Sequence, residues 1–243
     1  MKKGLTGVGV GPGDAGLITI NAIKAIRNCD IILLPNENKD DCYAYKIAKT
    51  AYEDIYGDID DKEIRSMSFP MTKDETILKK AQDNAFEDII GLIDEGKSLV
   101  FLTIGDPCVY STYHYIHRRV AESGRRADII SGVPSFCAVA ARLGISLGDK
   151  DEEIHIIPAT YDVKKAMEYT GTRVYMKSGR KLEELKTALN TENDIVKSQG
   201  GSLLVYAVSE CGLPGEKVMY GIDELCNQAQ LGYLTIVIVK KRI

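Results

Sequence analysis

Short apolar runs alternate with longer amphipathic segments through the first half of the chain. The short runs predict strands buried on both faces, and segments whose apolar positions recur every three or four residues predict helices. The expected strands are residues 5–10, 31–34, 99–104 and 127–130, and the expected helices are residues 17–27, 43–51, 75–94, 113–123 and 135–143. This alternation is typical of an α/β domain with a mostly parallel sheet.

The pattern changes after residue 143. Residues 144–153 contain two glycines and a run of charged side chains, which predicts a linker. The strands expected beyond it are residues 154–158, 173–177, 203–208, 217–221 and 233–240, with helices at 164–169 and 182–189. A strand-rich half of this kind predicts a second α/β domain with a mixed sheet. We therefore expect two domains, residues 1–148 and 149–243, with a small-molecule site in the cleft between them.

Three glycine-centred turns each follow an expected strand. They are Gly-Val-Gly-Val-Gly-Pro-Gly-Asp at 7–14, Gly-Asp-Pro at 105–107 and Ser-Gly-Val-Pro-Ser at 131–135. One such turn is a weak signal, because glycine is common wherever a chain turns sharply. Three turns at the carboxyl ends of strands predict backbone gathered around one small ligand, since crevices in open α/β sheets form there.

The first turn does not fit the common nucleotide-binding motifs. A dinucleotide fingerprint needs a third glycine where this chain has Pro12 or Asp14, depending on the register. The phosphate loop of nucleotide hydrolases needs a Gly-Lys-Ser or Gly-Lys-Thr that is missing here. Because Asp14 stands where a phosphate would need a donor, a neutral or cationic ligand is expected.

Composition narrows the class of protein. The chain has 243 residues, 44% of them hydrophobic and 27% charged, with a formal net charge of -4. This charge argues against a nucleic-acid partner bound by bulk electrostatics. No apolar run approaches the roughly 20 residues that span a bilayer, and the N-terminal residues lack the features of a signal peptide. We expect a cytoplasmic protein without a membrane partner.

Cysteines and histidines give no metal motif. The six cysteines are scattered without a Cys-x-x-Cys pair, so most are expected to be buried apolar fillers. His114 and His117 have one possible metal-ligand spacing, but no nearby cysteine or carboxylate clearly completes a site. Helix-surface histidines and no metal centre are expected.

In order and spacing, the three turns resemble those of the tetrapyrrole methylases. The resemblance extends to Leu-Ile-Thr at 17–19, Val-Tyr-Met-Lys at 174–177 and Ala-Val-Ser-Glu at 207–210, and so runs over nearly the whole chain. It implies a two-domain α/β enzyme, a homodimer, that transfers methyl groups from S-adenosylmethionine to corrin precursors and releases S-adenosylhomocysteine. Gly-Asp-Pro-Cys-Val-Tyr-Ser-Thr at 105–112 is most similar to the branch that methylates carbon 20 of precorrin-2 or its cobalt complex, cobalt-factor II, in cobalamin biosynthesis.

The resemblance also implies the residues that bind the cofactor. They are Pro12, Ile104, Gly105, Asp106, Val109, Ser111, Thr112, Pro134, Ser135, Met176 and Ala207. This chain departs from the family pattern in having Ser131 where many members have proline, and Pro134 where they often have threonine. The hydroxyl of Ser135, or backbone alone, is expected to replace the missing threonine.

The implied reaction needs mainly the alignment of a meso carbon with the sulfonium methyl group, because orienting two reacting groups can by itself accelerate a reaction greatly. Candidate catalytic residues are Asp106, Lys177 and Tyr110, and Glu210 is a further candidate base. Asp106 would face the bound cation or take part in the proton transfer. A substrate rimmed with carboxylates needs cations. The substrate contacts expected are Arg173, Lys177, Arg180 and Glu210, with Lys217 nearby in the sequence.

Alternatives remain open at this stage. Another methylase of the family would act on a different corrin carbon, on uroporphyrinogen III, on a modified histidine or on ribosomal RNA. A nucleotide-binding oxidoreductase or a non-catalytic binding module belongs to a different class. The sequence does not decide whether the substrate carries cobalt, which group is the general base, or whether residues 36–70 form a flap or a partner surface.

Overall fold

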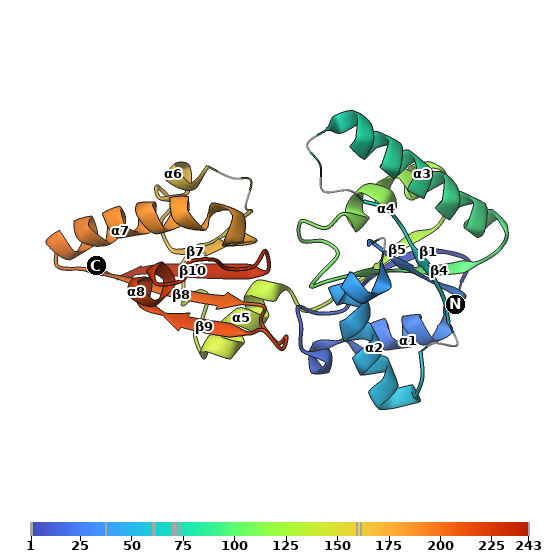
Figure 1. The fold of residues 1–243 in the computed structure, drawn as a ribbon, viewed down its shortest axis with the longest axis horizontal. Coiled ribbons are helices and arrows are strands. Elements are labelled where there is room, and N and C mark those ends of the chain that lie inside the picture. Colours follow the sequence, from blue (N-terminus) through green and yellow to red (C-terminus); the bar gives the residue numbers. More distant parts are fainter. Residues whose placement is uncertain are drawn as a thin grey trace. The chain divides into compact units, whose positions relative to one another are not determined.

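The computed structural model describes residues 2–242, apart from residues 37, 60, 61, 70, 71, 73, 159 and 161 and the side chain of Arg180. These residues divide into two compact units, Met1–Pro134 and Ser135–Ile243 (Figure 1). The division falls before helix α5 (Ser135–Leu143) rather than at the expected residue 148, because α5 contacts strand β10 of the second unit.

In the first unit the described residues form a five-stranded parallel sheet in the order β3-β2-β4-β1-β5. The strands are β1 (Gly4–Gly9), β2 (Ile31–Leu34), β3 (Glu63–Ser66), β4 (Ser98–Thr103) and β5 (Ala127–Ile130). The expected parallel sheet is confirmed. Because β1 lies between β4 and β5, the carboxyl ends of these three strands are neighbours at one edge of the sheet.

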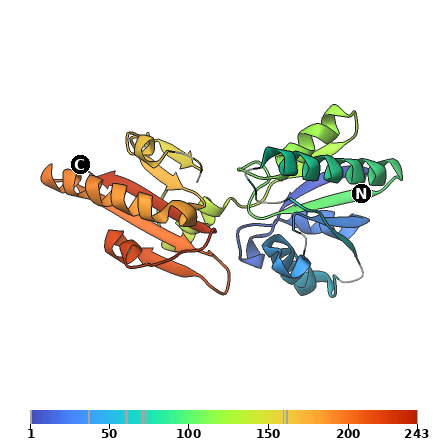
Figure 2. The same cartoon turned by 45° about the horizontal axis from the view of Figure 1, so that its top comes forward.

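Helices cover both faces of this sheet. Figure 2 shows α3 and α4 on one face and α1 and α2 on the other. The helices are α1 (Ile20–Asn28), α2 (Tyr43–Tyr56), α3 (Glu75–Asp94) and α4 (Tyr113–Glu122), with short 3-10 turns η1 (Ala15–Leu17) and η2 (Lys39–Asp41). The segment 36–70, whose role the sequence left open, contains η2, α2 and the edge strand β3 among its described residues.

Tyr113 packs and hydrogen-bonds helix α4 onto the sheet. Its ring is fully buried and lies against Gly7 of β1, where a Cβ would come within 2.1 Å of the ring. Its hydroxyl donates a hydrogen bond of 2.7 Å to the carbonyl of Asp128 in β5. Packing and hydrogen bonding together therefore fix where α4 begins, and with it the end of the loop that follows Gly105.

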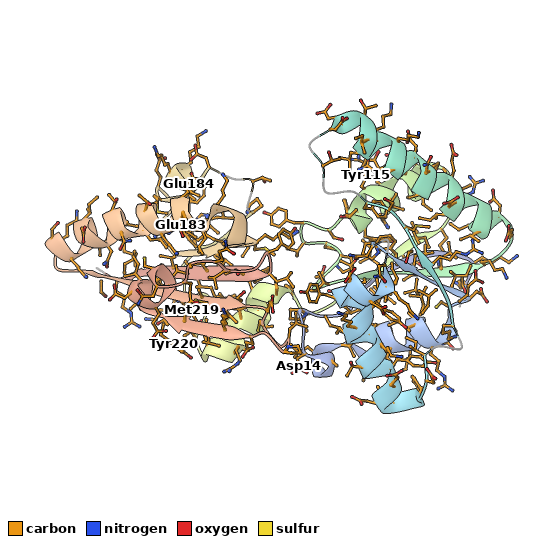
Figure 3. The ribbon with its side chains drawn as sticks, in the orientation of Figure 1. Asp14, Tyr115, Glu183, Glu184, Met219 and Tyr220 are labelled. Carbon is orange, nitrogen blue, oxygen red and sulfur yellow. The ribbon has the colours of Figure 1, made fainter. Side chains whose placement is uncertain are left out.

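The second unit has a mixed sheet in the order β6-β7-β10-β8-β9, as expected. β6 and β7 are parallel, and the other pairs are antiparallel. The strands are β6 (Ile154–Ile157), β7 (Thr172–Tyr175), β8 (Ser202–Ser209), β9 (Lys217–Tyr220) and β10 (Thr235–Arg242). Strand alternation is clear in β9, where Met219 is buried and Tyr220 is half exposed (Figure 3).

The second sheet packs against α7 (Leu182–Ser198) and α6 (Val163–Ala166), and further connections are η3 (Ser178–Lys181) and α8 (Gly221–Cys226). α7 continues beyond the expected residue 189, because Asn193 and Val196 are also buried. Glu183 and Glu184 occupy its first turn, where negative charge is favourable at a helix N-terminus (Figure 3). α8 was not predicted.

Within the described part of the chain, no helix has the length and apolar character needed to cross a membrane. No cluster of three or more potential metal-ligating side chains occurs there either. In the part of the chain that the structure describes, none of the six cysteines forms a disulfide, but only Cys29 and Cys42 are buried, so the expectation that most are buried fillers was wrong. Cys108 and Cys137 are exposed. His114 and His117 lie on α4, with their rings stacked at 5.9 Å.

Candidate functional site

The three glycine turns meet at the carboxyl ends of β4, β1 and β5, as the sequence predicted. The turns after β1 and β4 are joined by two backbone hydrogen bonds. Gly105 donates to the carbonyl of Gly11 at 2.7 Å, and Gly11 donates to the carbonyl of Gly105 at 3.3 Å. Gly105 has a φ of 71°, a left-handed conformation that glycine adopts at little cost.

Two further glycines let the turns approach one another closely. A Cβ on Gly9 would lie 2.6 Å from both the carbonyl oxygen of Gly105 and the backbone nitrogen of Gly132. A Cβ on Gly132 would lie 2.2 Å from the same carbonyl oxygen. Such distances exclude any side chain at either position without movement of the backbone. The glycines therefore serve the contact between loops.

Asp106 joins the turn after β4 to the turn after β5. Its side chain is only 6% exposed. One carboxylate oxygen accepts a hydrogen bond of 2.7 Å from the backbone N–H of Cys108, and the other accepts one of 3.0 Å from the N–H of Gly132. The hydroxyl of Ser131 also donates to this second oxygen. A buried carboxylate needs such donors, because burial without partners is costly.

The residues after Asp106 form an exposed loop that leads into α4. Tyr110 is 49% exposed and has a φ of 47°, which is uncommon for a residue other than glycine. The Ser111 hydroxyl accepts a hydrogen bond of 3.1 Å from the N–H of Tyr113, whereas Thr112 is exposed. Desolvation by neighbouring atoms and the Asp106 carboxylate raise the pKa of the Cys108 thiol, so Cys108 is poorly suited to act as a base or nucleophile.

The surface formed by these turns suits a cationic ligand with an apolar part. Of the expected contacts, Pro12 is buried, and Ile104, Val109 and Pro134 are half-buried. None of the segments 9–14, 104–110 and 131–134 contains a lysine, an arginine or a histidine. Close-packed glycine backbone, apolar side chains and carboxylates are what a sulfonium nucleoside such as S-adenosylmethionine would need.

A second set of loops gathers at one edge of the other sheet. β7 and β8 both end there, because each is antiparallel to β10, which begins there. Gly179, after β7, packs against the loop before β10, since a Cβ on it would lie 2.4 Å from the carbonyl of Gly232. Lys177 has a φ of 57°, and its ammonium lies 5.3 Å from the centre of the Tyr233 ring.

Glu210 occupies the corresponding position after β8. Its φ is 54°, and its N–H donates to the carbonyl of Leu234 at 3.0 Å. Its carboxylate lies so close to Gly215 that a Cβ there would be 2.1 Å from an oxygen. Lys217 belongs to the same edge, because it pairs with Ser209 across β8 and β9. The structure thus brings Lys177, Glu210 and Lys217 to one edge. Lys177, after β7, and Glu210, after β8, both have a positive φ, which is uncommon for residues other than glycine.

The loop of Glu210 is tied to α5. Arg142 donates to the carboxylate of Glu216 at 2.6 Å, and the other oxygen of Glu216 accepts a bond of 2.9 Å from the N–H of Gly212. Burial acts to raise the pKa of Glu216, but the Gly212 N–H and the Arg142 guanidinium outweigh it, so this pKa lies below its ordinary value. Glu216 thus joins helix α5 to the turn of residues 212–216.

Met176 and Ala207 lie beneath these loops. Ala207 is fully buried in β8, and Met176 is 6% exposed. Met176 borders a small, shallow hollow whose other walls are Ile157, Pro158, Val163, Tyr175, Ser178, Lys181 and Leu185. The hollow is largely apolar, with the Lys181 side chain on one wall. Ser135 is half-buried at the start of α5.

Arg173 does not lie at this edge. Its side chain is 1% exposed and pairs with Glu192 of α7 at 2.7 Å. A buried guanidinium held by a carboxylate in this way is a structural residue of the second unit, so its expected contact with substrate carboxylates was wrong. The Arg180 side chain lies outside the described part of the chain. Sequence reasoning missed the ring of Tyr233 and the Arg142–Glu216 pair, for which no local motif exists.

Comparison with known proteins shows the family to which this chain of two α/β units belongs. The sequence profile of the Tetrapyrrole (Corrin/Porphyrin) Methylases matches residues 4–224. The chain belongs to this family and is a methyltransferase.

Three individual proteins illustrate the similarity. A Methanocaldococcus jannaschii protein named "Probable cobalt-precorrin-2 C(20)-methyltransferase" is 32% identical over 99% of this chain and 97% of its own. The Salmonella typhimurium cobalt-precorrin-2 C(20)-methyltransferase is 26% identical over 100% and 98%. The structure of uroporphyrin-III C-methyl transferase from Thermus thermophilus, complexed with S-adenosyl homocysteine, shares the fold with a TM-score of 0.67 and 14% identity, covering 98% of this chain and 97% of its own.

Proposed function

We propose that this enzyme transfers a methyl group from S-adenosylmethionine to carbon 20 of precorrin-2 that carries cobalt. The observation that supports this most is the similarity over both full lengths to two proteins named for that reaction. The segment 105–112, with its Tyr-Ser-Thr, agrees with the same branch of the family.

The residues of the first unit would hold the methyl donor. When bound, the donor supplies an electrophilic methyl group on a positively charged sulfur. Backbone at Gly105 and apolar side chains such as Ile104 and Val109 would contact its nucleoside. The carboxylate of Asp106 would keep the loop in place and contribute negative charge near the cation. Pro12, Ser111, Thr112 and Pro134 border the same loops and remain proposed contacts, as do Ser135, Met176 and Ala207 in the second unit.

The second unit would bind the carboxylates of the macrocycle. Lys177 and Lys217 lie at the edge where β7 and β8 end, and Arg180 follows Lys177 in the sequence. Glu210 at the same edge would face a substrate N–H or accept the proton that carbon 20 loses, with Lys177 and Tyr110 as the other candidates for that proton transfer. We also propose that the enzyme is a cytoplasmic homodimer.

The test is a turnover assay with S-adenosylmethionine, run in parallel on cobalt-precorrin-2, metal-free precorrin-2 and uroporphyrinogen III. Mass spectrometry of the products counts the methyl groups added. Addition of one methyl group, fastest to the cobalt complex, is the expected result. Preferential methylation of uroporphyrinogen III would place the enzyme in another branch of the family.

A further inference from the structure

We propose that Ser131 is a positioning residue for methyl transfer, because its hydroxyl holds Asp106 and thereby keeps the loop after β4 in its binding conformation. This inference rests on the proposed binding of S-adenosylmethionine by the first unit. Neither the family profile nor the names of the relatives assign a role to this serine.

Among the described residues, the carboxylate of Asp106 accepts hydrogen bonds from two backbone N–H groups and from the Ser131 hydroxyl, and the Cys108 thiol lies beside it as a further, weak donor. The N–H groups of Cys108 and Gly132 belong to the backbone and are present whatever residues occupy those positions. The Ser131 hydroxyl is the third donor. Among the described residues no lysine, arginine or histidine forms an ion pair with Asp106. A hydroxyl is a stronger donor than a thiol, so Ser131 provides the strongest contact to this carboxylate that substitution of a side chain can remove.

This contact crosses a strand. β4 and β5 are not neighbours, because β1 lies between them. The hydrogen bonds from Ser131 and Gly132 to Asp106 thus pass over the carboxyl end of β1, at Gly9, where a Cβ would collide with both loops. On its other side Gly105 pairs with Gly11 of the first turn. The contact between Ser131 and Asp106 is thus one of the hydrogen bonds that join the three turns.

Because Ser131 lies at the surface, loss of its hydrogen bond to Asp106 should affect the loop more than the stability of the fold. Ser131 is exposed, whereas Asp106 and Gly132 are buried. Loss of the hydroxyl leaves no cavity in the core, and the two backbone donors still satisfy the buried carboxylate. We therefore expect Ser131→Ala to fold normally and to weaken the order of the loop, which is a cost paid on binding.

The experiment measures binding of S-adenosylhomocysteine by calorimetry to the whole protein, together with its thermal unfolding. Ser131→Ala is expected to weaken binding by about tenfold, because a hydrogen bond to a charged group is lost from the bound conformation. Ser131→Thr keeps the hydroxyl and should restore most of the affinity. The unfolding midpoints of both variants should match that of the wild type.

A matched control is Ser123→Ala. The Ser123 hydroxyl donates to the carbonyl of Val120 at 2.7 Å, at the far end of α4 from the turns. This variant should bind as the wild type does. Kinetically, Ser131→Ala should raise the KM for S-adenosylmethionine and leave the KM for the tetrapyrrole unchanged.

Three results would overturn the role of Ser131. They are wild-type affinity in Ser131→Ala, equal loss in the alanine and threonine variants, or a loss of affinity that merely follows a lowered unfolding midpoint. If the wild-type protein itself bound no S-adenosylhomocysteine, the proposed function would fail first, and the role of Ser131 in binding would fail with it.

Discussion

Asp106 accepts a hydrogen bond of 3.0 Å from the backbone of Gly132, across the end of the strand that separates them. This bond links two motifs that are remote in the sequence but belong to one surface. It also explains why Asp106 is buried although it is charged. The carboxylate is part of the frame of the site, whatever further role it has toward a bound cation.

Replacement of Asp106 by alanine should therefore affect both folding and binding. The substitution leaves the N–H groups of Cys108 and Gly132 without their acceptor, and each such loss costs about 1–3 kcal/mol where water does not replace it. We expect a free energy of unfolding lower by about 2–4 kcal/mol and no measurable binding of S-adenosylhomocysteine. Urea unfolding and calorimetry test this. If Asp106→Ala were as stable as the wild type, the Asp106 carboxylate would not be part of the frame of the site.

Close contact between the turns predicts an effect of adding a single methyl group. Gly132→Ala places a Cβ 2.2 Å from the carbonyl of Gly105, so one of the two loops must move. We expect destabilisation of about 1–3 kcal/mol, as for overpacked interiors, and weaker binding of S-adenosylhomocysteine. Gly91→Ala is the control, because a Cβ there meets nothing within 4 Å and lies in helix α3. It should stabilise the protein by about 0.5–1 kcal/mol. If both substitutions changed the free energy of unfolding similarly, the turns would not be as closely packed as the structure indicates.

The buried pair of Arg173 and Glu192 predicts a change in stability with no change in substrate binding. Arg173→Met leaves Glu192 without its partner, which for a buried pair costs about 3–5 kcal/mol. The double variant Arg173→Met with Glu192→Leu should recover much of this loss, because both charges are gone. Urea unfolding measures the stabilities, and the KM for the tetrapyrrole should stay unchanged in the double variant. A raised KM would restore Arg173 to the substrate site.

Lys177 provides the corresponding test at the substrate end. Lys177→Gln removes a cation from the edge of the second sheet, and a charge-assisted contact to a carboxylate is worth about 1.5–3 kcal/mol. We expect the KM for the tetrapyrrole to rise by about tenfold or more, with unchanged affinity for S-adenosylhomocysteine. Lys46→Gln, an exposed lysine on α2, is the control. Equal loss of affinity for both ligands would mean that Lys177 serves the fold instead.

The pair of Arg142 and Glu216 predicts a pH dependence. A carboxyl whose pKa is lowered by folding stabilises the folded state above its ordinary pKa, and that contribution is lost as the pH falls through the folded-state pKa. Arg142→Gln removes one of the groups that lower this pKa. Stability should then fall by less between neutral pH and about pH 3 than in the wild type, because the folded-state pKa lies closer to its ordinary value.

Urea midpoints measured between neutral pH and about pH 3, below the ordinary pKa of a glutamate, test this prediction. Arg65→Gln is the control, because it breaks an exposed pair with Glu63, a kind of pair that contributes little. Identical pH curves for Arg142→Gln and the wild type would show that Glu216 does not depend on the arginine.

Local sequence patterns were sufficient for much of the fold. Helix α3 was predicted with its observed bounds, because its apolar period is regular and Asp74 caps its first turn. Strand β3 was missed, since its residues Glu-Ile-Arg-Ser form an exposed edge with no apolar pattern. α7 was predicted too short, because the polar Asn190 and Thr191 resemble a helix end although Val196 continues the buried face.

The site was predictable in part for the same reason. Glycine turns after apolar strands are local signals, so the meeting of the three turns could be expected. The partners of Asp106 and of Arg173 are set by the order of strands and by the packing of α7, which no local pattern records. Arg173 therefore looked like a surface cation in the sequence, although it is buried against Glu192.

The most direct test of the proposed function is the position of the new methyl group. The enzyme would be incubated with cobalt-precorrin-2 and S-adenosylmethionine carrying a ¹³C-labelled methyl group, and the labelled carbon in the product would be assigned by NMR after removal of the metal where needed. A single labelled methyl group on carbon 20 is the predicted result. A label on any other carbon, or none despite bound S-adenosylhomocysteine, would contradict it.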